Sequence, residues 1–85
     1  MTTPTRAEVI AQLKTFICTE LVRNADLDLA DDEPIISGGI IDSFSLAHVA
    51  VFIENSFGVT IPDTELTVEN MDTLEQMAQR VQERM

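Results

Sequence analysis

The chain passes from loop to helix through Ser37-Gly38-Gly39-Ile40-Ile41-Asp42-Ser43-Phe44. An Asp-Ser pair alone is weak evidence, because such residues cap helices in many proteins. Here a long acidic loop precedes the pair, an amphipathic helix follows it, and Phe57-Gly58-Val59-Thr60-Ile61-Pro62-Asp63 closes that helix. A serine in the first helical turn lies among unpaired backbone N–H groups at the positive end of the helix dipole. We therefore interpret Asp42 as the N-cap and Ser43 as a candidate attachment point for a phosphate-linked group.

Apolar residues at helical spacing predict the helices on either side of this junction. Thr5-Arg6-Ala7-Glu8 fits a capping box and predicts a first helix from about Thr5 to Arg23, ended by Asn24. The second helix is expected from about Asp42 to Phe57, with Gly58 as its C-terminal stop.

Two further signals follow along the chain. Pro62-Asp63-Thr64-Glu65-Leu66 predicts a short helical turn capped by Asp63. Asp72-Thr73-Leu74-Glu75 predicts the cap of a last helix that runs to the end of the chain. Together the elements predict an all-α fold, a small four-helix bundle of three main helices plus a short third helix.

The connection from Asn24 to Asp42 is long for a compact domain, and such connections are usually functional or disordered. Its acidic residues are Asp26, Asp28, Asp31, Asp32 and Glu33. It is too apolar for a free linker, so we expect several of its apolar side chains to pin it across the domain: Leu27, Leu29, Ile35, Ile36, Ile40 and Ile41.

The second helix has two apolar faces. One is the expected core stripe, Leu46, Val49, Ala50, Ile53 and Phe57. The other is made by Phe44, Ala47 and Val51. A helix with two such faces is either deeply buried or presents one face to a partner, and in a domain of this size we expect the second.

The 85 residues make one domain, spanning 1–85. The formal net charge of −10 argues against binding nucleic acid or docking on an anionic membrane. No Lys or Arg occurs between Arg23 and Arg80, so the middle of the chain is an acidic field. A basic protein partner is its natural complement, although acidity that only maintains solubility would look the same.

The single cysteine, Cys18, cannot form an internal disulfide, and its place in the first helical pattern predicts a small core or boundary residue. No apolar run approaches the length of a membrane span, and the N-terminus lacks the apolar core of a signal peptide. We therefore expect a cytoplasmic protein.

The chain offers few groups for catalysis. Its one histidine, His48, is five positions from Ser43 on the same helix, roughly 140° around the axis, so the two side chains diverge. The acidic loop does not fit an EF-hand, because the turn glycine would fall on Asp31 and the terminal glutamate on Ser37. We expect no enzyme activity, no catalytic residue and no metal site.

Three stretches, in this order, resemble the acyl carrier protein and peptidyl carrier protein superfamily: Gly39-Ile40-Ile41-Asp42-Ser43-Phe44, Phe57-Gly58-Val59-Thr60-Ile61-Pro62-Asp63 and Asn70-Met71-Asp72-Thr73-Leu74. The resemblance covers nearly the whole chain. It implies a four-helix bundle with a short third helix, and it implies that Ser43 receives 4′-phosphopantetheine from coenzyme A through a separate phosphopantetheinyl transferase. The terminal thiol of this arm would hold an acyl or aminoacyl group as a thioester, and the carrier itself would not catalyse. Asp42 matches the aspartate that precedes the modified serine in the family.

The resemblance also implies a docking surface on the second helix. Phe44 matches a hydrophobic docking residue of the family, usually leucine or methionine, and we expect partners to contact it together with Ala47, His48, Val51 and Glu54. In fatty-acid carriers this helix is densely acidic, whereas here Glu54 is the one acidic residue among the comparable positions, the others being Ser45, His48, Asn55 and Ser56. The departure favours a specialised pathway, with partners that dock through a larger hydrophobic share.

Three functions remain open on this reading. The first is a freestanding, monomeric acyl carrier protein of fatty-acid-like, polyketide or other specialised biosynthesis. The second is an aminoacyl or peptidyl carrier protein of a nonribosomal-peptide-type pathway. The third is a helical adaptor that is never modified, although the intact Asp42-Ser43 pair favours a modified carrier. The expected partners are a phosphopantetheinyl transferase and loading ligases, synthases or transferases with basic or apolar docking patches.

Overall fold

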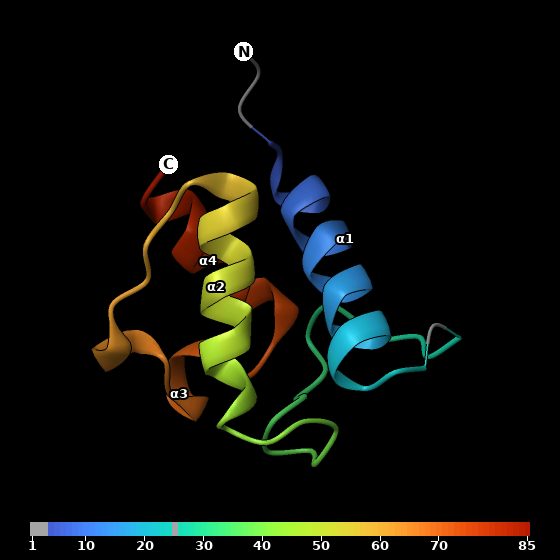
Figure 1. Cartoon of the computed structure of the whole chain (residues 1–85). Coiled ribbons are helices and arrows are strands. Elements are labelled where there is room, and N and C mark those ends of the chain that lie inside the picture. Colours follow the sequence, from blue (N-terminus) through green and yellow to red (C-terminus); the bar gives the residue numbers. More distant parts are fainter. Residues whose placement is uncertain (1–3, 25) are drawn as a thin grey trace.

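The computed structural model describes residues 4–24 and 26–85, and within them the chain is all-helical (Figure 1). Four α-helices follow one another as α1 (Arg6–Phe16), α2 (Ser45–Phe57), α3 (Val68–Met71) and α4 (Leu74–Glu83). A π-helical turn, η1 (Ile17–Leu21), extends α1, and a 3-10 turn, η2 (Asp63–Glu65), lies between α2 and α3. The predicted all-α bundle of three main helices and a short third helix is confirmed.

The first helix starts where the sequence predicts. The Thr5 hydroxyl accepts a hydrogen bond from the Glu8 N–H at 3.2 Å, and the Glu8 carboxylate accepts one from the Thr5 N–H at 3.3 Å. This reciprocal capping box satisfies two of the N–H groups that a helix start leaves unpaired.

The end of that helical segment differs from the prediction of an α-helix that stops at Asn24. The Val22 N–H bonds the Ile17 carbonyl at 2.8 Å, so the last turn is π-helical. Arg23 then takes a left-handed conformation with φ of 59°, and the Asn24 N–H reaches back to the Cys18 carbonyl at 2.7 Å. A left-handed residue followed by this long backbone bond ends many helices, usually with glycine in that place. The stop is therefore Arg23, one residue before the predicted one.

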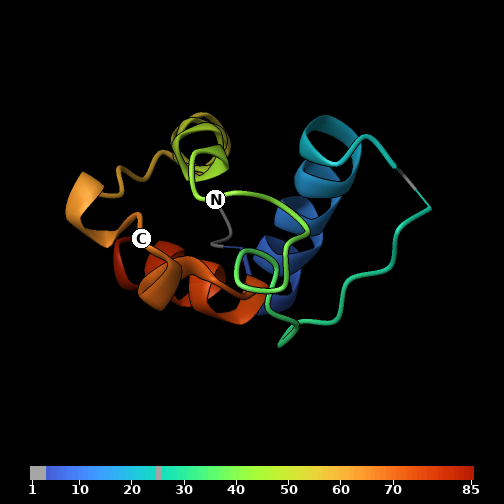
Figure 2. The ribbon, with the colours of Figure 1, turned by 90° about the horizontal axis from the view of Figure 1, so that it is seen from below.

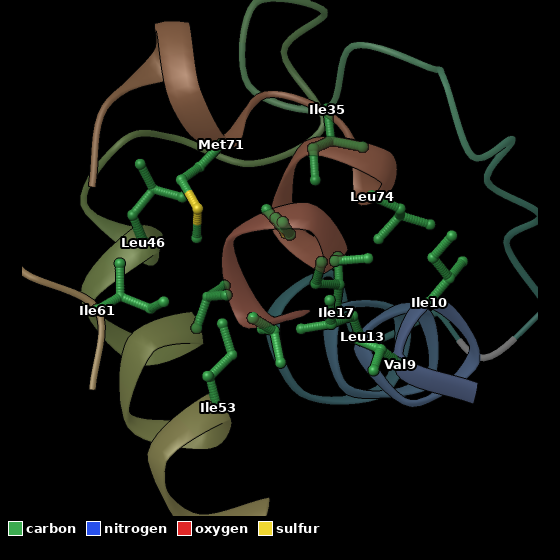
Figure 3. Close-up of a cluster of buried hydrophobic side chains, with 14 of the residues drawn as sticks. Val9, Ile10, Leu13, Ile17, Ile35, Leu46, Ile53, Ile61, Met71 and Leu74 are labelled. Carbon is green, nitrogen blue, oxygen red and sulfur yellow. The ribbon is translucent and has the colours of Figure 1, made fainter. Parts of the chain in front are cut away.

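Apolar side chains from all four helices meet in one core. α1 packs against α4 more extensively than any other pair of helices does. The stripe on α1 meets the stripe on α4, while Leu46, Val49 and Ile53 of α2 close the core from another side (Figure 3). Met71 of α3 and the buried Ile61 complete it, close to Leu46. The buried residues of α1, η1 and α4 are Val9, Ile10, Leu13, Ile17, Cys18, Leu74, Met77, Ala78 and Val81.

The second helix ends at the predicted glycine. Gly58 adopts φ of 69°, a left-handed conformation that costs glycine little, and its N–H bonds the Glu54 carbonyl at 2.9 Å. The bond satisfies a carbonyl that would otherwise lack a partner at the helix end.

The short third helix lies later than predicted. Residues 62–66 form only the 3-10 turn η2, and Asp63 does not cap it through its side chain. The α-helical turn is α3, where the extended Thr67 acts as N-cap and its hydroxyl accepts the Asn70 N–H at 3.3 Å. The carboxylate of Glu65 pairs with Arg84 and, at 3.9 Å, with Arg80, which ties η2 to the end of α4.

The cap of α4 also differs from the prediction. Thr73, and not Asp72, is the N-cap: its hydroxyl accepts the Gln76 N–H at 3.1 Å, and the Gln76 side-chain oxygen accepts the Thr73 N–H at 3.2 Å. Threonine and glutamine thus form a complete capping box without the aspartate. The Asp72 carboxylate is free for another contact.

Two valines on α2 test the division of this helix into an inner and an outer face. Val49 is fully buried, and we expect Val49→Ala to lower the free energy of unfolding by roughly 2–3 kcal/mol because it leaves a cavity. Val51 is 58% exposed, and Val51→Ala should change stability by less than about 0.5 kcal/mol. Urea unfolding followed by circular dichroism measures both. Equal losses for the two variants would mean that the outer face of α2 is covered.

Candidate functional site

Ser43 lies on the surface in the turn that leads into α2. The backbone bonds here span three residues: the Ser45 N–H donates to the Asp42 carbonyl and the Leu46 N–H to the Ser43 carbonyl, both at 3.2 Å. The α-helix proper begins at Ser45, so the predicted helix start is confirmed to within the turn that precedes it. The Ser43 side chain stands beside the N-terminal end of a 13-residue helix.

Asp42 acts as the cap of this turn. Its Oδ1 accepts the Ser45 N–H at 3.0 Å and the Ser45 hydroxyl at 3.1 Å. Asp42 therefore caps the turn before α2 and not the α-helix itself, whose N-cap is Phe44 without a side-chain cap bond, so the predicted N-cap role of Asp42 is corrected to this turn. These bonds also distinguish the two serines. The Ser45 hydroxyl donates to Asp42, whereas no residue in the described part of the chain hydrogen bonds to the Ser43 hydroxyl.

The loop before Ser43 closes on itself around Ile35. The Ile40 and Ile41 N–H groups both donate to the Ile35 carbonyl at 2.9 Å, and the side chains of Ile35 and Ile41 are buried. Gly38 approaches the backbone so closely that a Cβ would stand 2.2 Å from the Pro34 carbonyl oxygen, and Gly39 has φ of 82°. Both glycines are thus required by the shape of the turn. The predicted pinning of the loop by its apolar residues is confirmed.

Asp72 holds the same loop from outside. Its carboxylate accepts the Ile36 and Ser37 N–H groups, each at 2.9 Å, and the Ser37 hydroxyl at 2.6 Å. Its backbone carbonyl accepts the Ile35 N–H at 2.8 Å. Figure 2 shows the loop lying beside the junction of α3 and α4. Sequence reasoning took Asp72 for a helix cap; the signal against that assignment was Thr73 with Gln76 three residues later, which already forms a capping box.

The bonds that Asp72 accepts also set its charge state. Burial acts to raise the pKa of Asp72, but the hydrogen bonds from Ser37 and Ile36 outweigh it, and the pKa lies below its ordinary value of 3.8. The carboxylate is therefore ionised at neutral pH, the form that accepts all three hydrogen bonds.

A surface hollow of about 490 Å³ opens beside Ser43. Its exposed lining is more polar than apolar. Its lining residues are Leu21, Ile36, Gly39, Ile40, Ile41, Asp42 and Ser45. The loop that Asp72 holds supplies most of these residues.

The predicted docking residues share the outer face of α2. Phe44 is 85% exposed and Val51 is 58% exposed, and Ala47, His48 and Glu54 are exposed as well. Their spacing of three or four positions places them on one stripe of the helix. Val68, 37% exposed on α3, is a further surface apolar residue that sequence reasoning did not single out.

Cys18 and the acidic loop form no comparable site. Cys18 is 3% exposed, which confirms it as a core residue, and burial raises the pKa of its thiol in spite of nearby Lys14. Lys14 instead pairs with Asp28 at 2.6 Å. Within residues 4–24 and 26–85, no three His, Cys, Asp or Glu side chains gather where they could hold a metal ion. The same residues contain no helix with the length and apolar character of a membrane span.

Comparisons with known proteins place this chain in a family. The family described as "Phosphopantetheine attachment site" matches residues 11–81. A D-alanyl carrier protein of Bacillus velezensis is 32% identical over 59 residues, which cover 67% of this chain and 68% of that protein. No solved structure matches the chain.

Asp72 gives the fold a defined dependence on pH. Because its pKa is lowered by folding, its charge stabilises the fold above pH 3.8, and that stabilisation is lost as the pH falls through the lower folded value. We expect Asp72→Asn to be less stable than the wild type by about 1 kcal/mol near pH 7, a difference that shrinks as the pH falls to about 2. Urea unfolding at a series of pH values measures it. A difference that persists unchanged at the lowest pH would trace the loss to the amide's geometry and not to the charge.

Proposed function

Because the chain belongs to the phosphopantetheine attachment family of carrier proteins, we propose that it is a carrier whose prosthetic arm is attached to Ser43. Proteins of this family carry covalently bound 4′-phosphopantetheine and work with a phosphopantetheinyl transferase and biosynthetic enzymes. The observation that supports Ser43 as the attachment site is its exposure in the turn before α2. The hydroxyl of the nearby Ser45 is instead hydrogen bonded to Asp42.

The residues around Ser43 fit a phosphate-linked arm. The Ser43 oxygen would take the place of the adenosine bisphosphate portion of coenzyme A on phosphorus and lose its proton to a base of the transferase or to water. The product is a phosphodiester anion beside the N-terminal end of α2, where the helix dipole favours negative charge. Once bound, the arm supplies a terminal thiol that holds cargo as a thioester.

The chain's own part in this chemistry is presentation. Asp42 and the turn at residues 42–45 hold Ser43 at the surface, and the tether raises the effective concentration of cargo at each enzyme that the carrier meets. We propose that the protein has no catalytic activity of its own. A second reading, an adaptor that is never modified, predicts a protein that refuses the arm.

Partners are proposed to dock on the outer face of α2. Phe44, Ala47 and Val51 supply an apolar patch, with His48 and Glu54 on the same stripe. Exposed aromatic and aliphatic side chains are typical anchors at the centre of protein interfaces. Such a patch suits enzymes whose docking surfaces are apolar. Basic groups around those surfaces would complement the net charge of −10 that this chain carries.

Two kinds of cargo are proposed. The first is an acyl group of a fatty-acid-like, polyketide or other specialised pathway. The second is an aminoacyl or peptidyl group, and the match to a D-alanyl carrier protein favours it. The mass of the protein isolated from its host distinguishes them, because the thioester-bound group is read directly from the intact protein.

The attachment site is tested with coenzyme A and a broad-specificity phosphopantetheinyl transferase. We expect the wild type to gain the mass of one arm and Ser43→Ala to gain none while remaining folded, because the nucleophilic oxygen is absent. Intact mass spectrometry measures the gain, and circular dichroism the fold.

Matched controls come from the two neighbouring serines. Ser37→Ala and Ser45→Ala remove hydroxyls that are already hydrogen bonded, and both should still accept one arm. An arm on Ser37 or Ser45 in the wild type would overturn the assignment, and a wild type that stays unmodified beside a reactive control carrier would favour the adaptor.

The docking face is tested by Phe44→Ala and Val51→Ala. Each removes an exposed apolar side chain, so we expect roughly 5- to 50-fold lower kcat/KM with a partner enzyme and little change in stability. Met85→Ala, which removes an apolar side chain that is 43% exposed at the far end of α4, serves as the control. Unchanged kinetics for both α2 variants, or their unfolding, would contradict the docking role.

A further inference from the structure

We propose that Asp72 is a positioning residue for the modification of Ser43: its carboxylate latches the 35–41 loop and so sets where the serine is presented. The inference rests on the proposed function, in which Ser43 is the acceptor. The sequence pattern assigned Asp72 to a helix cap. The proposal gives it a different role, although its carboxylate does not itself contact the Ser43 hydroxyl.

The latch is a contact between distant parts of the chain. Asp72 stands between α3 and α4, and the two N–H groups that it binds belong to Ile36 and Ser37, 36 and 35 positions away. The Ser37 hydroxyl adds a third bond to the second carboxylate oxygen. Bonds to an ionised acceptor are stronger than neutral ones, and here they meet on one side chain. Two adjacent N–H groups on one carboxylate oxygen hold the loop's orientation as well as its position.

The loop has few other attachments near this point. Most of its own backbone bonds run to the Ile35 carbonyl and the Ile36 carbonyl, so they close the loop but do not fasten it to the bundle. The one backbone bond that does fasten it joins the Ile35 N–H to the Asp72 carbonyl at 2.8 Å, and it holds only the start of the loop. Fastening comes from the buried side chains of Ile35 and Ile41 and from Asp72. The first half of the 24–42 connection has a separate attachment to α4, a hydrogen bond from the Glu75 N–H to the Asp31 carbonyl at 3.0 Å.

The loop transmits its position to Ser43 over a short path. Ile41 is buried, Asp42 follows it directly and caps the turn, and Ser43 is the next residue. A loop closed by two bonds to Ile35 and by the tight approach of Gly38 to Pro34 moves as one unit. Releasing Ser37 from Asp72 therefore lets the unit pivot about Ile35 and takes Ser43 with it.

This arrangement predicts which kinetic constant changes. If only a fraction of the carrier molecules present Ser43 correctly, only that fraction can bind the transferase productively. The apparent affinity of the transferase for the carrier then falls in proportion to that fraction. The chemistry at Ser43 is unchanged once the carrier is bound. Loss of the latch should therefore raise KM for the carrier and leave kcat near the wild-type value.

The test uses the full chain, coenzyme A and a purified phosphopantetheinyl transferase, with arm addition followed over a range of carrier concentrations. For Asp72→Ala we expect KM to rise roughly tenfold with kcat within about twofold of the wild type. Ser37→Ala, which keeps both N–H bonds, should raise KM less. Asp72→Asn, whose amide oxygen can still accept the two N–H groups, should restore most of the lost affinity.

A second readout does not depend on modification. Amide hydrogen exchange at Ile36 and Ser37 should become about tenfold faster or more in Asp72→Ala, because these N–H groups lose their acceptor. Thr5→Ala is the matched control: it removes the cap of α1, at the opposite end of the bundle from the loop (Figure 1), and lowers stability without touching the latch. It should leave KM unchanged.

The outcomes separate the latch from the proposed function. Wild-type KM and wild-type exchange in a folded Asp72→Ala would overturn the latch, as would an equal rise in KM for Thr5→Ala. Failure of the wild type to accept the arm would sink the proposed function, yet fast exchange at Ile36 and Ser37 in Asp72→Ala would still establish the loop contact.

Discussion

The exposed part of the loop that leads to Ser43 is held by one carboxylate. The Asp72 side chain binds Ile36 and Ser37 across the bundle, the Asp72 carbonyl accepts the Ile35 N–H, and the other backbone bonds of the loop run back to its own residues. The proposed attachment role requires an exposed Ser43, so burial of the serine itself cannot hold it in place. A small domain solves this by burying the residues on either side of the loop, Ile35 and Ile41, and by fixing the exposed part with a charged acceptor.

The second helix divides its surface between a buried face and an exposed face that also carries apolar residues. Leu46, Val49 and Ile53 are buried, whereas Phe44 and Val51 project from the other side. A helix can do both because side chains three or four positions apart share a face and those two apart do not. Exposed apolar residues are costly to leave in water unless a partner covers them. These residues lie beside Ser43, the proposed attachment site.

The few cations of the chain are used to fasten it together. Arg6 pairs with Glu75, Lys14 with Asp28, and Arg80 and Arg84 with Glu65. Each of these surface pairs joins two different segments of the chain. With a net charge of −10, the remaining surface carries a negative field that can steer basic partners toward the carrier.

The sequence by itself determined what depends on local patterns: the Thr5–Glu8 capping box, the Gly58 stop, the two faces of α2, and Ser43 behind the Asp42 cap. These follow from spacing and from neighbours a few residues apart. Only the tertiary structure decided the roles of Asp72, Arg23 and the short third helix. Asp72 and Thr73 both suit an N-cap, and the choice between them depends on a loop 35 positions away, whose N–H groups bind one carboxylate and leave the threonine to the helix. The local pattern of Thr73 and Gln76 favours the threonine as cap. No local pattern places the Asp72 carboxylate on the loop, because that contact exists only once the bundle has folded.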